Sequence, residues 1–265
     1  MSAVERLTRA ILGLWTGLML VFVLTPILTI VLFSFNSGRY YAFPLRGFTL
    51  RWYAALMDEG RIGTALASSL VIALAVMAAA TVLGTLFAFF IARASAPFKG
   101  LMVAAGFLPL VVPVLVLAAG LQIAFVDLGL PLGYGTVILG HTIYATPFVT
   151  LMVAAQLLHY DTRLDDAARD LGATPAQTLR LVTLPILWPG IRSGALLAFL
   201  LSFNEWAIAF FNGRGFNSLP MLVYSLQRNG LPPTVLAYAT LSTAVVLVIA
   251  VAILPVATGL IRGNR

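Results

Sequence analysis

Long apolar runs alternate with short polar stretches along the whole chain. A helix needs about 20 mostly apolar residues to cross a bilayer. Six runs meet that length, at 10–38, 62–92, 101–126, 136–158, 191–212 and 234–261. The pattern therefore predicts an all-α integral membrane protein with six transmembrane helices.

Two of these runs are interrupted in ways that bear on structure. Pro109 and Pro113 fall inside the third run, where the missing backbone donors predict a kink. Asn204 and Glu205 fall inside the fifth run. An ionised carboxylate within a span costs about 2.5–3.5 kcal/mol, so it usually faces a cavity or a partner. The fifth run thus contains a candidate polar site.

The most charged stretch of the chain lies between the fourth and fifth runs, at 160–190. It contains seven of the charged residues of a chain that is only 9% charged. Leu164, Ala167, Ala168 and Leu171 recur there at helical spacing, which predicts one apolar face about two turns long. We interpret this stretch as a polar elbow beside the membrane.

Capping residues predict two short helices within 160–190. Thr162 and Asp165 approximate a capping box, and Gly172 is suited to end the first helix with positive φ. Thr174 then predicts an N-cap, with Pro175 at the first helical position and Gln177 reaching back. Pro185 and Pro189 are expected to bend or end the second segment. The prediction is a helix-turn-helix elbow.

Composition agrees with a membrane protein rather than a soluble domain. Hydrophobic residues make up 61% of the 265 residues, against 45–50% in soluble domains. The first run is far longer than the core of a signal peptide, so we expect an uncleaved first span. The predicted division is 1–61, the first span and an external loop, and 62–265, a five-span core containing the 160–190 elbow.

Charge distribution predicts the orientation of the chain. Placing both termini in the cytoplasm puts ten basic residues inside and six outside, as the positive-inside rule favours. The inside set is Arg6, Arg9, Arg93, Lys99, Arg163, Arg169, Arg180, Arg192, Arg262 and Arg265. The outside set is Arg39, Arg46, Arg51, Arg61, Arg214 and Arg228. The elbow is then cytoplasmic.

The external loop also has Tyr40, Tyr41, Phe43 and Trp52, which suit membrane anchoring at least as well as partner docking.

Enzymatic and metal chemistry find little support. The chain has no cysteine, and its two histidines, His141 and His159, lie about 27 Å apart on one predicted helix. We therefore expect no catalytic residues and no metal site. No phosphate-binding G-x-x-x-x-G-K-[ST] sequence occurs, so ATP is not expected to bind this chain in that way.

The stretch from Asp166 to Thr174, with Leu184-Pro185 after it, resembles the EAA loop of inner-membrane permeases of binding-protein-dependent ABC importers. Asp166 stands where the family more often has Glu, which keeps the charge and shortens its reach. The resemblance implies a type I importer fold and a cytoplasmic coupling helix between spans 4 and 5 that docks on an ATPase. The coupling residues it implies are Asp165, Asp166, Ala167, Ala168, Asp170, Leu171, Gly172, Ala173, Thr174 and Pro185.

A second set of motifs resembles the spermidine/putrescine branch of these permeases. The motifs are Ser202-Phe203-Asn204-Glu205, Leu219-Pro220-Met221 and Tyr224-Ser225, with Asn204 replacing the first of the usual two acids. The implied solute is small and polar or cationic. Candidate residues for the translocation path are Asn204, Glu205, Trp206 and His141. Glu205 pairing with an arginine across a subunit interface, His141 as a helix-packing residue and Trp206 as a membrane-interface marker are the alternatives.

The resemblance also implies partners and location. The expected partners are a second permease subunit, two ATPase subunits that bind ATP and Mg²⁺, and a periplasmic or lipid-anchored solute-binding protein. The expected location is the bacterial inner membrane, with no cofactor in this chain and no nucleic-acid partner. A membrane assembly protein that transports nothing, or the same permease role for a solute other than a polyamine, are the alternative functions.

Overall fold

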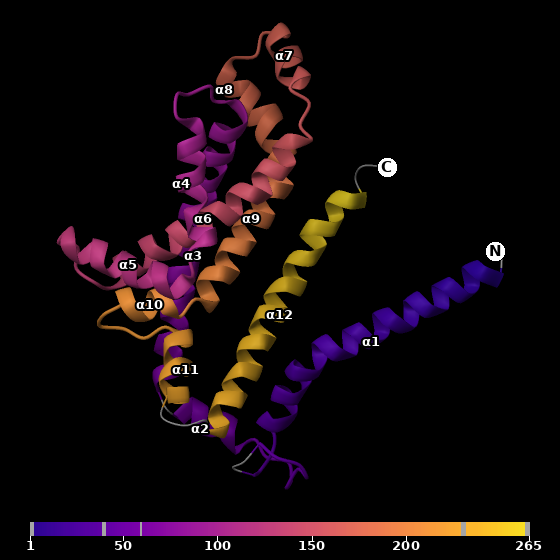
Figure 1. Cartoon of the computed structure of the whole chain (residues 1–265), viewed down its shortest axis with the longest axis vertical. Coiled ribbons are helices and arrows are strands. Elements are labelled where there is room, and N and C mark those ends of the chain that lie inside the picture. Colours follow the sequence, from indigo (N-terminus) through magenta and orange to yellow (C-terminus); the bar gives the residue numbers. More distant parts are fainter. Residues whose placement is uncertain (1–2, 39–40, 59, 229–231, 263–265) are drawn as a thin grey trace. The chain divides into compact units, whose positions relative to one another are not determined.

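The computed structural model describes residues 3–38, 41–58, 60–228 and 232–262, and these residues are almost entirely helical (Figure 1). Arg39, Tyr40 and Arg265, named above, lie outside them. The helices are α1 (Ala3–Ser34), α2 (Arg51–Asp58), α3 (Arg61–Arg93), α4 (Lys99–Val111), α5 (Val114–Asp127), α6 (Tyr134–Leu158), α7 (Arg163–Asp170), α8 (Pro175–Thr178), the π-helical turn η1 (Leu179–Thr183), α9 (Leu184–Asn204), α10 (Ala207–Asn212), α11 (Leu219–Arg228) and α12 (Pro233–Arg262). The predicted all-α class is confirmed for the described residues.

The chain separates into two units. One comprises Met1–Gly60 with Ser225–Ile249, and the other comprises Arg61–Tyr224 with Ala250–Arg265. In the first unit, Asn36 is buried and organises the loop after α1: its Oδ1 accepts from the backbone N–H of Arg46 at 3.0 Å, and its carbonyl accepts from Trp52 Nε1 at 2.8 Å. This loop is therefore held by polar side chains.

Four described helices are long and apolar enough to cross a membrane, and a bent pair would make five. The four are 7–34, 61–93, 134–158 and 175–204. The bent pair is α4 and α5, which meet at 115° where the sequence predicts one kinked span. Pro109 leaves α4 helical, whereas Pro113 precedes α5 and marks the break. The predicted kink is therefore present as a break between two helices at Pro113.

The fifth predicted span also has different bounds. The helix begins at Pro175, passes through η1 and ends at Asn204, rather than running from 191 to 212. Pro185 and Pro189 both lie inside this continuous helix, Pro185 just after the π-helical turn. Of the expectation that these prolines bend or end the segment, the ending is wrong, because the helix continues past both of them. They follow a π-helical turn, in which the N–H of Leu184 donates to the carbonyl of Leu179.

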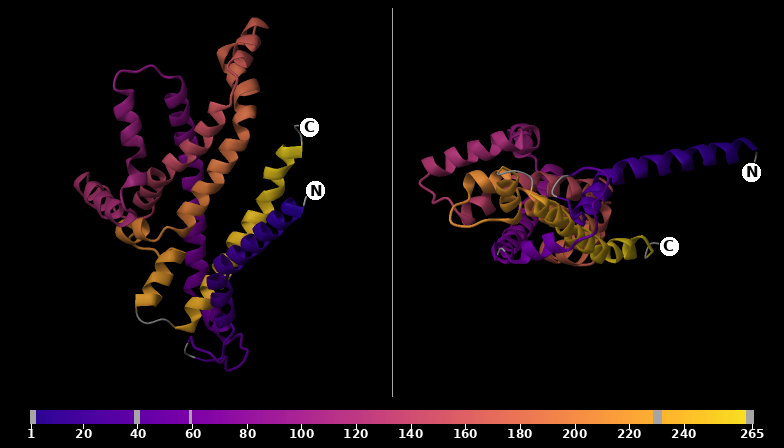
Figure 2. Two further views of the ribbon diagram at one scale, coloured as in Figure 1. Left: turned by 45° about the vertical axis from the view of Figure 1, so that its right-hand side comes forward. Right: turned by 90° about the horizontal axis from the view of Figure 1, so that it is seen from below.

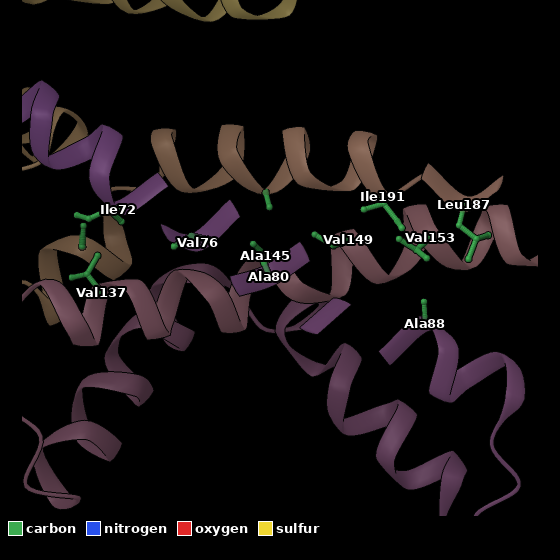
Figure 3. Close-up of a cluster of buried hydrophobic side chains, with 12 residues drawn as sticks. Ile72, Val76, Ala80, Ala88, Val137, Ala145, Val149, Val153, Leu187 and Ile191 are labelled. Carbon is green, nitrogen blue, oxygen red and sulfur yellow. The ribbon is translucent and has the colours of Figure 1, made fainter. Parts of the chain in front are cut away.

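The core of the second unit lies between α3, α6 and α9. Val149, which has no exposed surface, belongs to this core (Figure 3), and it lies against a glycine from each of the two neighbouring helices. A Cβ on Gly84 of α3 would lie 2.7 Å from Val149 Cβ, and one on Gly194 of α9 would lie 2.9 Å from Val149 Cγ1. Small residues at such contacts let the backbones of membrane helices approach closely. The three helices therefore pack as one group.

This packing positions two polar regions. In Figure 1 and in the left view of Figure 2, α7 and α8 lie beyond one end of the α6 and α9 pair, and α10 lies at the other end beside α5. Gln122 Nε2 of α5 donates to the carbonyl of Phe211 at 2.6 Å, and Asn212 Nδ2 donates to the carbonyl of Ala118 at 3.2 Å. These bonds fix α10 to α5.

Candidate functional site

The elbow begins with α7, which ends at Gly172. Gly172 has φ 88°, its N–H donates to the carbonyl of Arg169 at 2.8 Å, and the N–H of Ala173 donates to the carbonyl of Ala168 at 3.0 Å. Positive φ costs a glycine little because it has no Cβ. The predicted left-handed helix end is confirmed.

The second helix of the elbow starts with the capping box that its sequence predicts. Thr174 Oγ1 accepts from the N–H of Gln177 at 3.3 Å, and the N–H of Thr174 donates to Gln177 Oε1 at 2.8 Å. Pro175 occupies the first turn, where its missing donor is tolerated. Gly172 and this box together fix the turn between α7 and α8.

The predicted capping box at the start of α7 is wrong. Thr162 makes no side-chain capping bond; instead Asp161 Oδ1 accepts from the N–H of Arg163 at 3.0 Å. Asp165 cannot reach back to Thr162 because its carboxyl turns into the protein, where only 5% of the residue is exposed. A tertiary contact replaces the local one.

Asp165 receives hydrogen bonds from three side chains on different segments. Arg93, the last residue of α3, donates to Oδ2 at 2.7 Å and forms an ion pair. Tyr160 and Thr183 donate to Oδ1 at 2.5 Å and 2.9 Å. The Arg93 guanidinium also lies 5.7 Å from the centre of the Tyr160 ring. We call these four residues the Asp165 cluster.

The cluster keeps Asp165 ionised at neutral pH. Burial by itself raises the pKa of this carboxyl. The hydroxyls of Tyr160 and Thr183 and the charge of Arg93 together lower the pKa by more than burial raises it, so the pKa lies below its ordinary value. The pKa of the Tyr160 hydroxyl is raised, first by burial and then by its bond to Asp165. Tyr160 thus remains a donor.

The other elbow residues are open to solvent in this chain. Asp166, Ala167, Asp170, Thr174 and Pro185 are exposed, while Ala168 and Ala173 are half-buried. Leu164 is 45% exposed and Leu171 is 90% exposed. The apolar face that the helical spacing predicts is thus largely uncovered. An exposed apolar face rimmed by charges is typical of a protein interaction surface.

A second site lies where α9 ends, at Asn204 and Glu205. Glu205 has extended backbone, and its Oε1 accepts from the N–H groups of Ala207 at 2.6 Å and Ile208 at 3.3 Å. It therefore caps the start of α10. Within the described part of the chain, no basic side chain forms an ion pair with Glu205. The intrachain contacts thus use one carboxylate oxygen.

The neighbours of Glu205 differ in their surroundings. Asn204 is exposed, and its Nδ2 donates to the carbonyl of Leu200 at 2.9 Å. Trp206 is half-buried and stacks on Tyr224, with ring centroids 4.2 Å apart, and Phe210 meets Tyr224 edge-on at 5.3 Å. Glu205 is therefore followed by an aromatic cluster, which the sequence did not reveal because Tyr224 lies on another helix.

His141 lies in the interior of the helix bundle. It is 1% exposed, and its Nδ1 lies 2.9 Å from Ser202 Oγ, which joins α6 to α9. This placement favours the helix-packing role of His141 over the path role. The structure thus connects His141 to Ser202, two residues from Asn204, and leaves the elbow residues at the other end of α9.

Several residues of these sites gave no functional signal in the sequence. Arg93 was only one of the basic residues that predict the orientation, and Thr183 lies in an ordinary helical pattern. Their partner Asp165 is 72 residues from Arg93 and 18 from Thr183. The one available signal was that Arg93 is the only charge between 62 and 98. It identifies a charge near the membrane surface but not its partner.

Comparison with protein families gives a direct match. The model described as "Binding-protein-dependent transport system inner membrane component" matches residues 84–261. That range includes α6, both helices of the elbow, the end of α9 and α10.

Two relatives from Escherichia coli (strain K12) cover most of the chain. The putrescine transport system permease protein PotI is 36% identical over 232 residues, which are 83% of this chain and 81% of PotI. The spermidine/putrescine transport system permease protein PotC is 33% identical over 242 residues, 90% of each chain.

Two solved structures share the fold at low identity. One is a bacterial alginate ABC transporter in complex with an alginate pentasaccharide-bound periplasmic protein, with a TM-score of 0.70, 17% identity and coverage of 93% of this chain and 92% of that one. The other is the methionine ABC transporter MetNI in inward-facing conformations, with a TM-score of 0.60, 22% identity and coverage of 80% and 99%.

Proposed function

Since the chain belongs to the family of binding-protein-dependent transport system inner membrane components, we propose that it forms the translocation path of a polyamine importer. The protein is a multi-pass permease subunit of the inner membrane that couples to an ATPase. It is not itself the enzyme, because ATP hydrolysis is carried by a separate subunit. The proposal concerns its solute, topology and contacts.

Glu205 carries the proposal of a cationic solute. It is a half-buried carboxylate at a helix break, and one of its oxygens is used by the cap of α10. In a low-dielectric site a carboxylate attracts an ammonium group much more strongly than it does in water. The PotI and PotC relatives, named for putrescine and spermidine transport, support the same solute class. Asn204, Trp206 and His141 are proposed as secondary path residues, and His141 is the weakest of them because it is buried.

Six spans are proposed from the helices and the apolar pattern together. They are α1, α3, the broken pair α4–α5, α6, the helix that ends with α9, and α12. The charge distribution supports cytoplasmic termini and a cytoplasmic elbow. This topology places the elbow on the side of the membrane where ATP is available.

The elbow is proposed as the coupling helix. Its exposed leucines, Leu164 and Leu171, offer an apolar face, and Asp166 and Asp170 offer charges beside it. The proposed partners are two ATPase subunits, which would bind ATP and Mg²⁺, a second permease chain and a solute-binding protein. The chain would supply the path and the contact, and the partners would supply hydrolysis and solute capture.

Reconstitution tests the proposed function. The chain is coexpressed with its candidate partners and placed in proteoliposomes with the binding protein, and uptake of radiolabelled putrescine and spermidine is measured with and without ATP. ATP-dependent polyamine uptake is expected. Uptake of an uncharged solute alone would refute the cationic class. Copurification without any ATPase would favour the assembly protein.

Cysteine labelling tests the topology without background, since the chain has no cysteine. A Thr174→Cys variant is expected to react with a membrane-impermeant maleimide only when the cytoplasmic side is accessible. A Phe43→Cys variant in the external loop, where Phe43 is 71% exposed, is the matched control and should react from the opposite side. Labelling of Thr174→Cys from outside would refute the coupling role.

A further inference from the structure

Two consecutive aspartates of α7 have opposite environments. Asp165 is 5% exposed and accepts three side-chain hydrogen bonds, whereas Asp166 is exposed. Both belong to the stretch that the sequence assigned to the ATPase contact. A carboxyl that is already enclosed by its own chain cannot also dock a partner. The two residues therefore have different roles.

The Asp165 cluster joins segments that are distant in sequence. Arg93 ends α3, Tyr160 lies in the link from α6 to α7, and Thr183 belongs to η1 just before α9. Asp165 is the group they share, because each donates directly to its carboxylate. Through one side chain, the elbow is thus connected to all three helices of the core.

Charge and hydrogen-bond geometry both strengthen the connection that Asp165 makes. The ion pair and the two hydroxyl bonds use both oxygens of Asp165, and charge-assisted hydrogen bonds are about twice as strong as neutral ones. Thr183 faces the cluster from the π-helical turn, and such turns are frequent at functional sites. Its Oγ1 also donates to the carbonyl of Thr178 at 3.4 Å, which links η1 to α8.

We propose that Asp165 is a positioning residue that fixes the elbow to the end of α3 through Arg93, while Asp166 remains free for the partner surface. This inference rests on the proposed coupling function. A displacement of the elbow by the ATPase would then reach α3 directly, in addition to the covalent paths into α6 and α9.

A distance measurement on the full-length chain in nanodiscs tests this connection between the elbow and α3, which we call the joint, without any partner. Spin labels are placed at Leu86→Cys on α3, which is 61% exposed, and at Arg169→Cys on α7, which is exposed. A single narrow distance distribution is expected for the parent pair. Asp165→Asn should broaden it at least about twofold, and Asp166→Asn, the adjacent matched control, should leave it narrow. An unchanged width with Asp165→Asn would overturn the inference.

Variants of Arg93 separate the ion pair from general damage to the fold. Arg93→Gln should broaden the distribution as Asp165→Asn does, whereas Arg93→Lys, which keeps the charge, should keep most of the narrow width. The double variant Arg93→Gln with Asp165→Asn should give a distribution no broader than that of either single variant. The Arg93 side chain is 38% exposed, so replacing it perturbs the interior less than replacing Asp165 does. The Arg93 variants therefore provide the test if Asp165→Asn fails to insert into the membrane. Additive broadening in the double variant would refute a shared joint.

The assembled importer gives the functional test. Asp165→Asn should keep ATPase association within about threefold but lower solute-stimulated ATP hydrolysis about tenfold, within the 5–150-fold range of typical coupling energies. Asp166→Asn should mainly weaken association. Equal loss of association in both variants would overturn the inference. If the parent chain binds no ATPase, the proposed function fails, and the spin-label result still decides the joint.

Discussion

The two carboxylates near opposite ends of α9 are satisfied in different ways. Asp165 receives a cation and two hydroxyls and is 5% exposed, whereas Glu205 receives two backbone N–H groups on one oxygen and is half-buried. A buried acid with hydrogen bonds on both of its oxygens holds a structure in place. Among the described residues, the hydrogen bonds to Glu205 use one carboxylate oxygen at a helix break, which fits the proposed contact with a cationic solute. This difference supports the structural role proposed for Asp165 and the transport role proposed for Glu205.

The largest effect is expected at Glu205. Glu205→Gln keeps an oxygen that can cap α10 but removes the charge, so polyamine uptake should fall by at least about tenfold, given the strength of an ion pair at low dielectric. Uptake and subunit composition are measured on one preparation.

The control for Glu205 is Glu205→Asp, which keeps the charge and should retain more uptake than Glu205→Gln. An intact Glu205→Gln complex with full uptake would remove the transport role. A complex that dissociates would instead indicate an interface pair, since a buried partner charge would be left uncompensated.

Gly172→Val tests whether the orientation of the elbow matters as much as its charges. A branched side chain at φ 88° costs about 1–2 kcal/mol, so the elbow should be misplaced while the spans insert normally. Solute-stimulated ATP hydrolysis, measured beside membrane yield, should fall. Gly172→Asn, which tolerates this conformation, is the control. Full stimulation in a well-expressed Gly172→Val protein would contradict the role of the turn.

Tyr160→Phe removes one donor to Asp165 and keeps the aromatic ring beside Arg93. The expected loss of stability is about 1.5–3 kcal/mol, as for a single hydrogen bond to a charged group. Thermal unfolding in detergent measures it. Tyr160→Phe should also raise the rate at which a protease cleaves the elbow. Tyr53→Phe is the matched control: it removes the hydroxyl 2.7 Å from Ser34 Oγ in the other unit and should leave that cleavage rate unchanged. A faster rate in both variants would show general destabilisation.

Acidification should give the smallest effect, because it acts only below the ordinary aspartate range. The pKa of Asp165 is lowered in the folded chain, so its stabilising contribution is present above the unfolded-state pKa and is lost as pH falls through the folded-state pKa. The difference in melting temperature between the parent and Asp165→Asn should therefore shrink only at acid pH. A difference that shrinks near pH 7 would contradict the assignment.

Local rules predicted local features and failed where distant segments meet. The Gly172 helix end and the Thr174 capping box depend on residues within a few positions, and both are confirmed. The Thr162–Asp165 box is wrong because Arg93 and Thr183 offer Asp165 stronger donors than its own helix does. Sequence spacing contains no information about those donors.

The spans show the same limit. Hydropathy located the apolar runs, but it could not show that Pro113 separates two helices at 115° or that α9 ends at Asn204. Both helix breaks depend on which groups bond to the backbone N–H and C=O groups that are left without helical partners. At the second break Glu205 satisfies two N–H groups of α10, a capping role that its position within an apolar run did not suggest.

The contact of Val149 with Gly84 and Gly194 has a mechanical consequence. At these separations neither α3 nor α9 can slide along α6 without the backbone of one helix meeting the side chain of another. This close packing opposes relative translation within the trio, so a force applied at the elbow is expected to rotate the three helices together. Opening and closing of the path would then be a rigid rotation against neighbouring elements, and a methyl group added at either glycine would act as a wedge that changes its axis.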